Sequence, residues 1–343
     1  MSNETLYFDF HGIILKVLSS DKESASFISS DFSYFLLKST SENMEPQISV
    51  SVFLSNPPYD LIPDGTLAAY HTKNSVVYRS GSIQFYDSFG KALVIYDYRH
   101  ESAEIYSLDR DILYENTYLM IMSRVGHLLD RKGLHRIHAM GVVYNGKTAL
   151  CVLPMGGGKT TLTLSLLENR DFSLLSEEVP LISSNGLLYP FPIRMGVMEG
   201  TPLSIPEGFL KSFKRTHYEP KTLIDIQHFR DQIANVAKPG LIFVGKRIYS
   251  PNPKITRTSS IKCFLSLFRY CVMANGIPQL LEYVLRLDII TMLRQLPIFF
   301  SRLLASLVLV TKSESYEIHL GYDLKANAAL LTEFILNKFR NTN

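Results

Sequence analysis

Cysteine, strong net charge and unbroken apolar runs are all scarce in this sequence. Its 343 residues include three cysteines, too few and too scattered for a disulfide framework or a zinc site. The formal net charge of +3 is small for this length and predicts no nucleic-acid partner. No basic region followed by a long apolar stretch opens the chain, so no secretory signal is expected and the predicted location is the cytoplasm.

The most apolar late segment, 289–310, is interrupted by charge and by proline. It contains Arg294, Pro297 and Arg302, whereas a bilayer span needs about 20 uninterrupted apolar residues. We therefore expect a buried or groove-forming helix and no stable membrane insertion. A basic amphipathic helix at a membrane surface is the alternative.

What the sequence does contain is the balance of a globular protein, with 46% hydrophobic and 20% charged residues. The length allows one large domain or two ordinary ones. Up to residue 107 the chain has short stretches rich in β-branched and aromatic residues, separated by turn formers. This pattern predicts an N-terminal accessory domain, 1–107, of mostly antiparallel β structure. The predicted strands are 6–17, 34–38, 47–54, 75–78, 83–86 and 91–98.

A helical pattern begins after residue 107 and opens the second predicted domain, 108–343. Apolar residues recur at threes and fours until Gly133 closes the stretch. Asn145 and Gly146, between two apolar strands, are the strongest short hairpin signal. The fold class is therefore α/β or α+β, with a C-terminal helical segment. The predicted elements are a helix over 108–132, strands over 136–144 and 147–154, a helix over 162–167, and strands over 173–182 and 187–191.

The second hairpin strand runs into a glycine-rich segment and then a helix, which is the setting of a phosphate-binding loop. Glycines let the backbone surround an anion with its amides pointing inward, and the helix adds the positive end of its dipole. Lys159 is expected to reach the outer phosphates of ATP or another nucleoside triphosphate, and Thr160 to hold Mg²⁺. The predicted nucleotide-binding residues are Met155, Gly156, Gly157, Gly158, Lys159, Thr160 and Thr161.

One position departs from the usual pattern G-x-x-x-x-G-K-[ST]. The first glycine of that pattern falls at Leu153, and three consecutive glycines before Lys159 partly restore the motif. The alternative is a glycine-rich turn with an incidental lysine. The order strand, loop, helix favours the phosphate loop.

Two carboxylates and a histidine are predicted near this loop. Glu177 and Glu178 end the next strand, where ligand groups gather in α/β sheets. A carboxylate there can hold Mg²⁺ or take the proton from an attacking hydroxyl. Because successive strand residues face opposite ways, both glutamates reach the site only if the strand ends or bulges. The alternatives are solvated charges for the glutamates and a hydrogen-bonded core histidine for His138.

The stretches 138–150, 154–162, 174–178 and 189–193 resemble HPr kinase/phosphorylase. They are more similar still to HPr kinase-related proteins, including those that phosphorylate lasso peptide precursors. The resemblance covers 134–200 well and the remainder in outline. It implies the C-terminal P-loop fold of HPr kinase, a mixed sheet with flanking helices. Phosphoenolpyruvate carboxykinase has the same loop type but is much longer, with metal-binding elements that are not found here.

Carried over by position, the resemblance implies catalytic roles for Glu178, Lys159, His138 and Glu177. Glu178 matches the general base, His138 lies beside the phosphates, and Lys159 holds them together with the glycine amides of the loop. Glu177 is the paired acid and, with Thr160, the implied metal ligand. The family's usual Asp-Asp is Glu-Glu here.

A further metal-binding glutamate of the family has no clear match in this sequence. The aligned region is 191–194, and Glu199 is a weak substitute. The absence of this family glutamate puts the reverse activity, that of a phosphorylase, in doubt more than the kinase activity.

A basic pair, Lys246 and Arg247, follows an apolar run and could close over a transferred phosphoryl group. A solvated turn is an equally good interpretation. Lys254, Arg257 and Lys262 form a second basic stretch, interpreted as a surface face unless an acidic or phosphorylated substrate binds it.

The leading functional hypothesis is a kinase that phosphorylates a serine or threonine hydroxyl of a protein or peptide, such as a ribosomally made precursor. The first alternative keeps the chemistry but makes the acceptor a sugar or a free amino acid. The second is a nucleotide-sensing module without transfer. The sequence leaves open whether the chain forms a homo-oligomer.

Overall fold

The computed structural model describes residues 4–39, 45–154, 156–201, 203–213, 219–279 and 293–340, and the chain divides into two compact units. The first comprises Met1–Leu128, Met198–Asp225 and Pro278–Val284, and the second comprises Leu129–Val197, Ile226–Ile277 and Leu285–Asn343. The boundary predicted near residue 107 precedes helix α2 (Arg110–Arg131), whereas these units divide within that helix.

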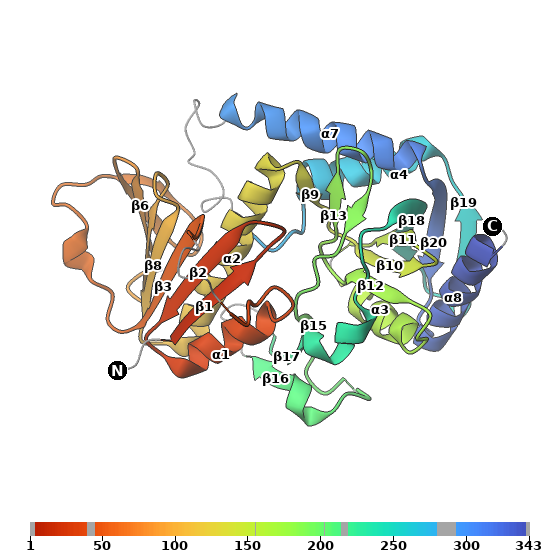
Figure 1. The fold of residues 1–343 in the computed structure, drawn as a ribbon, viewed down its shortest axis with the longest axis horizontal. Coiled ribbons are helices and arrows are strands. Elements are labelled where there is room, and N and C mark those ends of the chain that lie inside the picture. The colour runs from red at the N-terminus through yellow and green to blue at the C-terminus, as the bar shows by residue number, and fades with distance from the viewer. Residues whose placement is uncertain are drawn as a thin grey trace. The chain divides into compact units, whose positions relative to one another are not determined.

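The first unit is built on an eight-stranded sheet (Figure 1). Its strands are β1 (Glu4–Asp9), β2 (Ile14–Ser19), β3 (Ile48–Leu54), β4 (Ala68–His71), β5 (Val76–Ser80), β6 (Ile83–Asp87), β7 (Ala92–Asp97) and β8 (Ser102–Ser107). The spatial order is β1-β2-β3-β8-β7-β6-β5-β4. β3 runs parallel to β2 and β8, and the other neighbours are antiparallel. The unit is thus mostly antiparallel, as the short strands predicted.

The first unit differs from the prediction in three places. Helix α1 (Lys22–Asp31) was not predicted, because its small polar residues give no apolar period; its start is fixed by Asp21, whose carboxylate accepts from the Ser24 amide. The strand predicted over 34–38 is reduced to an isolated bridge between Phe8 and Leu36. The predicted strand 6–17 is a hairpin of β1 and β2.

Smaller elements complete the first unit. They are η1 (Tyr59–Leu61), η2 (Glu207–Phe209), β16 (Leu210–Phe213) and β17 (Lys221–Ile224). The last two strands pair antiparallel.

The second unit is built on a six-stranded mixed sheet. Its strands are β10 (Met140–Tyr144), β11 (Lys147–Val152), β12 (Ser173–Ser176), β18 (Lys238–Arg247), β19 (Lys254–Arg257) and β20 (Glu314–Leu320). They lie in the order β12-β10-β11-β18-β20-β19. β11, β18 and β20 are parallel to one another, while β10 is antiparallel to both its neighbours and β19 to β20.

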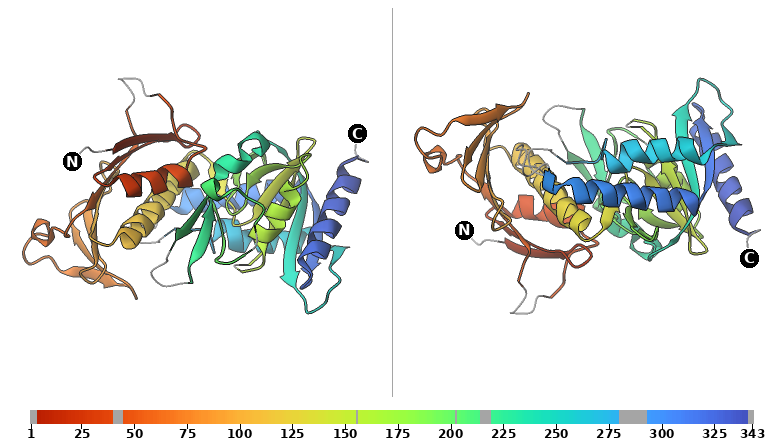
Figure 2. Two further views of the ribbon diagram at one scale, coloured as in Figure 1. Left: turned by 90° about the horizontal axis from the view of Figure 1, so that it is seen from below. Right: turned by 90° about the horizontal axis from the view of Figure 1, so that it is seen from above.

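Helices cover both faces of this sheet (Figures 1 and 2). Helix α4 (Ser260–Leu267), the π-helical turn η4 (Phe268–Val272) and helix α7 (Leu296–Thr311) share a core with one face. Helices α3 (Lys159–Leu167) and α8 (Leu324–Arg340) share a core with the other. This arrangement agrees with the predicted class of α/β or α+β.

Shorter elements surround this core. They are β9 (Leu134–Arg136), β13 (Leu181–Ser183), β14 (Leu188–Tyr189), β15 (Met195–Met198) and η3 (Ile226–Gln232). The predicted strand 136–144 is interrupted between β9 and β10, and the predicted strand 173–182 between β12 and β13.

The apolar segment predicted as a helix over 289–310 overlaps α7, which ends one residue later, and 289–292 lie outside the described residues. Among the helices that the structure describes, none combines the length and apolarity needed to cross a bilayer.

Candidate phosphate-binding site

The segments predicted to carry chemistry meet at one edge of the six-stranded sheet. β11 and β18 are parallel, so the loop after Val152 and the residues around Arg247 emerge at the same edge. β10 runs the other way, so His138, just before it, lies there as well. β12 is antiparallel to β10 and ends at this edge, so Glu177 and Glu178 follow it there.

The loop itself has the backbone that a glycine-rich turn requires. Gly158, the N-cap of α3, has φ +93°, a left-handed conformation that side chains disfavour. A Cβ on Gly157 would meet the Pro154 carbonyl oxygen at 2.8 Å. Gly156 also has positive φ, and Met155 lies outside the described residues.

One amide of the predicted anion ring is occupied within the loop. The Gly157 N–H donates to the Pro154 carbonyl at 3.0 Å, so it is not presented to a ligand in this conformation. The first helical turn consists of Lys159, Thr160 and Thr161, whose amides have no intrahelical acceptor, as at every helix start. The helix start therefore offers donors that Gly157 does not.

Leu153, at the position of the missing first glycine, is fully buried. Its side chain lies over Gly245 of the neighbouring strand β18: a Cβ built on Gly245 would be 2.1 Å from the Leu153 Cδ2 atom. It also underlies Gly157, whose Cβ would come within 3.1 Å of the Leu153 Cβ. The leucine is thus accommodated because the adjacent strand carries a glycine.

Lys159 is buried beneath the loop and contacts His138. The Lys159 Nζ atom lies 2.9 Å from the His138 Nε2 atom and 3.4 Å from the Leu153 carbonyl oxygen. The pKa of Lys159 is lowered, because the effect of burial exceeds the opposing effect of the nearby Glu177 and Glu178 carboxylates. The structure thus brings the predicted lysine, histidine and glutamates into one electrostatic cluster.

His138 is neutral in this cluster. Burial, and then the Lys159 charge, lower its pKa from 6.5 to about 3. Because Lys159 donates to Nε2, the imidazole proton is on Nδ1, which is buried without a hydrogen-bond partner among the described residues. Gly276 covers the ring: a Cβ there would lie 2.8 Å from the His138 Cδ2 atom, and the glycine has φ +80°.

Thr160 and Glu177, the two predicted metal ligands, are in direct contact. The Thr160 hydroxyl donates to the Glu177 Oε1 atom at 2.7 Å and lies 3.5 Å from the Gly196 carbonyl oxygen. Glu177 is buried, whereas Glu178 is half-buried. Both follow the end of β12 at Ser176, which meets the condition that the strand must end for both glutamates to face the site.

The basic pair after β18 separates into two environments. Arg247 is exposed, and its Nη1 atom lies 3.7 Å from the position of a Cβ on Gly158, so its guanidinium borders the loop. Lys246 instead forms an ion pair with Glu317 at 2.6 Å. Lys262 binds the other oxygen of Glu317 at 2.7 Å, and the two lysines lower the pKa of Glu317 to about 2.

Other basic and acidic candidates do not join the contacts around Lys159. Lys254 and Arg257 are exposed on the edge strand β19. Glu199 is exposed and belongs to the first unit, where the Ser212 hydroxyl lies 3.5 Å from its carboxylate. No three His, Cys, Asp or Glu side chains among the described residues form a group suited to a metal ion.

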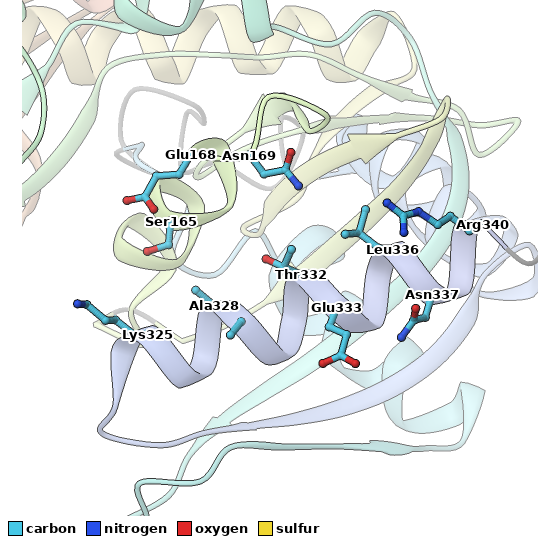
Figure 3. A pocket seen from close by; sticks show the side chains of 11 residues that line it. Ser165, Glu168, Asn169, Lys325, Ala328, Thr332, Glu333, Leu336, Asn337 and Arg340 are labelled. Carbon is cyan, nitrogen blue, oxygen red and sulfur yellow. The ribbon is translucent and has the colours of Figure 1, made fainter.

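A separate cavity of about 720 Å³ lies between α3 and α8. Figure 3 shows Ser165 and Glu168 on one side and Lys325, Thr332 and Arg340 on the other. None of the predicted site residues lines it, so it is not the predicted nucleotide site.

Sequence reasoning missed three contributors to the site: Gly245, Gly276 and the Gly196 carbonyl. Each lies far along the chain from the group that it touches, and each acts through backbone or through the absence of a side chain. A single sequence carries no signal for such contacts.

No protein-family model and no curated protein matches this chain.

Proposed function

We propose that this chain is an ATP-dependent kinase that phosphorylates a serine or threonine hydroxyl of a protein or peptide. The observation that carries the proposal is the 2.7 Å contact between Thr160 and Glu177 at the start of α3. It joins a hydroxyl in the first turn of α3 to a carboxylate that follows the end of β12, beside the buried Lys159. Such a combination is typical of P-loop sites for nucleoside triphosphates.

The donor set at this contact fits Mg²⁺. Magnesium prefers oxygen ligands and usually binds through one or two carboxylates, several waters and the phosphates of its substrate. Thr160 and Glu177 would hold the ion, and no larger protein cage is needed. When bound, magnesium neutralises negative charge on the phosphates.

The remaining side chains have complementary roles in this proposal. Lys159 binds the outer phosphates, exchanging its contact with His138 for phosphate oxygens. Arg247 borders the loop and stabilises charge that develops on the transferred group. Glu178, which is less buried than Glu177 and not bound to Thr160, orients the acceptor hydroxyl.

Transfer then proceeds by in-line displacement. The acceptor oxygen forms a bond to the γ-phosphorus while the bond from that phosphorus to the β–γ bridging oxygen breaks. The hydroxyl proton passes to the Glu178 carboxylate, and ADP leaves.

Mass spectrometry of candidate peptides encoded beside the gene, incubated with ATP and magnesium, tests the proposal. A gain of about 80 Da, one phosphoryl group, is expected with the native chain and not with Lys159→Ala. Lys325→Ala, an exposed lysine on α8, is the matched control and keeps the activity. Transfer that persists in Lys159→Ala contradicts the assignment.

Two other functions give different results in the same assay. A small-molecule kinase consumes ATP with a sugar or amino acid and leaves every peptide unmodified. A nucleotide-sensing module binds ATP without turnover, and Glu178→Gln then changes no activity. The absence of the family's further metal-binding glutamate from 191–194 is the observation that favours this second alternative.

A further inference from the structure

The outer side of the α4–α7 layer is an apolar surface rimmed by cations. Figure 1 and the right-hand view of Figure 2 show these helices side by side on one face of the six-stranded sheet. Phe268 of η4 packs against Phe299 of α7, with ring centroids 6.2 Å apart. Buried residues on the inner sides of both helices contribute to the core, so the exposed residues of α4 and α7 lie on the outer side of the layer.

Each helix exposes a row of large apolar side chains at helical spacing. On α7, Phe300 is 60% exposed and Leu304 is 54% exposed. On α4, Ile261 is 72% exposed and Leu265 is 61% exposed. Three more exposed residues extend these rows: Met273 directly after η4, and Leu296 and Leu307 of α7. Positions three or four apart share one side of a helix, so these rows face away from the sheet.

The two segments that carry these rows have charges of one sign. The segments 254–279 and 293–313 contain no aspartate or glutamate. Exposed cations lie at three places: Arg269 continues the α4 row, Arg294 precedes α7, and Lys312 follows it. Lys312 also donates to the Asn185 carbonyl oxygen at 2.8 Å, a neutral partner that leaves its charge unpaired. The other cations of the two helices form ion pairs with carboxylates: Lys262 with Glu317 and Arg302 with Asp130.

We propose that this surface, defined by the seven exposed apolar residues and the three cations, binds the face of an anionic lipid bilayer. Apolar side chains enter the boundary between headgroups and acyl chains, and arginine and lysine reach the lipid phosphates. α7 spans about 24 Å at the usual helical rise, with cations before and after it, which suits a helix lying in the membrane plane. No helix needs to cross the bilayer.

The charge pattern disfavours a second copy of the chain on the same surface. A two-fold interface presents the same patch from both partners. It would bring Arg269, Arg294 and Lys312 of both copies into one interface without an acidic residue from these segments to pair them. An anionic lipid supplies the missing charge.

Flotation of the full chain with vesicles tests the proposal. We expect it to float with phosphatidylcholine vesicles that contain phosphatidylglycerol and to remain unbound with phosphatidylcholine alone. Raising the salt concentration should weaken the binding. Equal binding to neutral vesicles, or none to either, overturns the proposal.

Two sets of variants locate the binding surface. Phe300→Glu with Leu304→Glu lowers the vesicle partition coefficient by at least about tenfold. Arg269→Gln and Arg294→Gln each lower it about fivefold. Leu324→Glu changes an exposed leucine on α8 and serves as the control, which leaves partition unchanged.

Circular dichroism and light scattering complete the experiment. An unchanged spectrum shows that a weakened variant is folded. The native chain could instead be a dimer that does not float with vesicles and that Phe300→Glu with Leu304→Glu converts to a monomer. That result would assign the surface to a second copy of the chain and overturn the proposal. The proposal is also overturned if the control Leu324→Glu lowers flotation as much as the double variant does.

Discussion

Acidification should destabilise the protein through His138, because the Lys159–His138 contact requires a neutral imidazole. The folded-state pKa of about 3 lies below the value of 6.5 for a free side chain. The unfolded chain therefore binds a proton between these values that the folded chain does not. The stabilisation from the neutral ring is complete above pH 6.5 and is lost as the pH falls toward 3.

The size of the effect follows from that gap. It amounts to about 5 kcal/mol at most over the whole range, with a slope of about 1.4 kcal/mol per pH unit inside it. Other groups titrate in the same range, so the relevant quantity is a difference between variants. His138→Asn keeps an acceptor for Lys159 and removes the titrating ring.

Denaturant unfolding of both proteins at several pH values between 4 and 6.5 measures this difference. The chain has no tryptophan, so circular dichroism is the suitable signal. We expect the stability of the native chain to fall more steeply with acid than that of His138→Asn. Histidine-selective NMR should show a neutral ring with its proton on Nδ1. Equal slopes, or an imidazolium at pH 6, would refute the buried Lys159–His138 pair.

Three further predictions concern groups around the loop. If the proposed kinase function holds, Glu177→Gln should raise the magnesium concentration needed for turnover about 10- to 100-fold, measured by titrating the metal at fixed ATP; an unchanged requirement would remove this residue from the proposed metal site. Gly276→Ala destabilises the protein by about 1–3 kcal/mol in thermal unfolding. Gly133→Ala, with a similar φ of +77° but open space around it, costs less, and equal losses contradict the close approach of Gly276 to the imidazole. Gly245→Ala and Leu153→Ala each lower the free energy of unfolding, but the double variant loses about 0.5–3 kcal/mol less than the sum of the two single losses. Strictly additive losses would rule out a contact between the two residues.

The sequence predicted those parts of the fold that local chemistry dictates. The Asn145-Gly146 turn is one, since both residues have positive φ, as the tight hairpin between β10 and β11 requires. Helix α2 is another, because its apolar residues recur over 22 residues. The order of strand, glycine-rich turn and helix around Lys159 is also as predicted.

The two strand interruptions that the sequence did not predict have different causes, one a distant contact and the other a local turn. The interruption between β9 and β10 places His138 outside regular strand, where its amide donates to the Tyr270 carbonyl. The interruption after Ser176 is set by that residue's own side chain, whose oxygen accepts from the Val179 amide. Apolar residues on both sides of each break continue the strand pattern, so periodicity alone joins the two halves.

The leucine at the first-glycine position shows why a motif should be judged by the space it occupies. Taken alone, Leu153 counts against a phosphate loop because the pattern requires glycine there. In the folded chain the side chain points under Gly157 and onto Gly245, and the loop above it retains the left-handed glycines that it needs. The space that the pattern obtains from a glycine at position 153 is therefore supplied by Gly245 on the parallel strand β18. A buried leucine also supports the loop through packing that glycine cannot supply, so restoring the consensus with Leu153→Gly should open a cavity and cost about 2–5 kcal/mol. A gain in unfolding free energy for Leu153→Gly would show instead that the leucine is a defect of the loop.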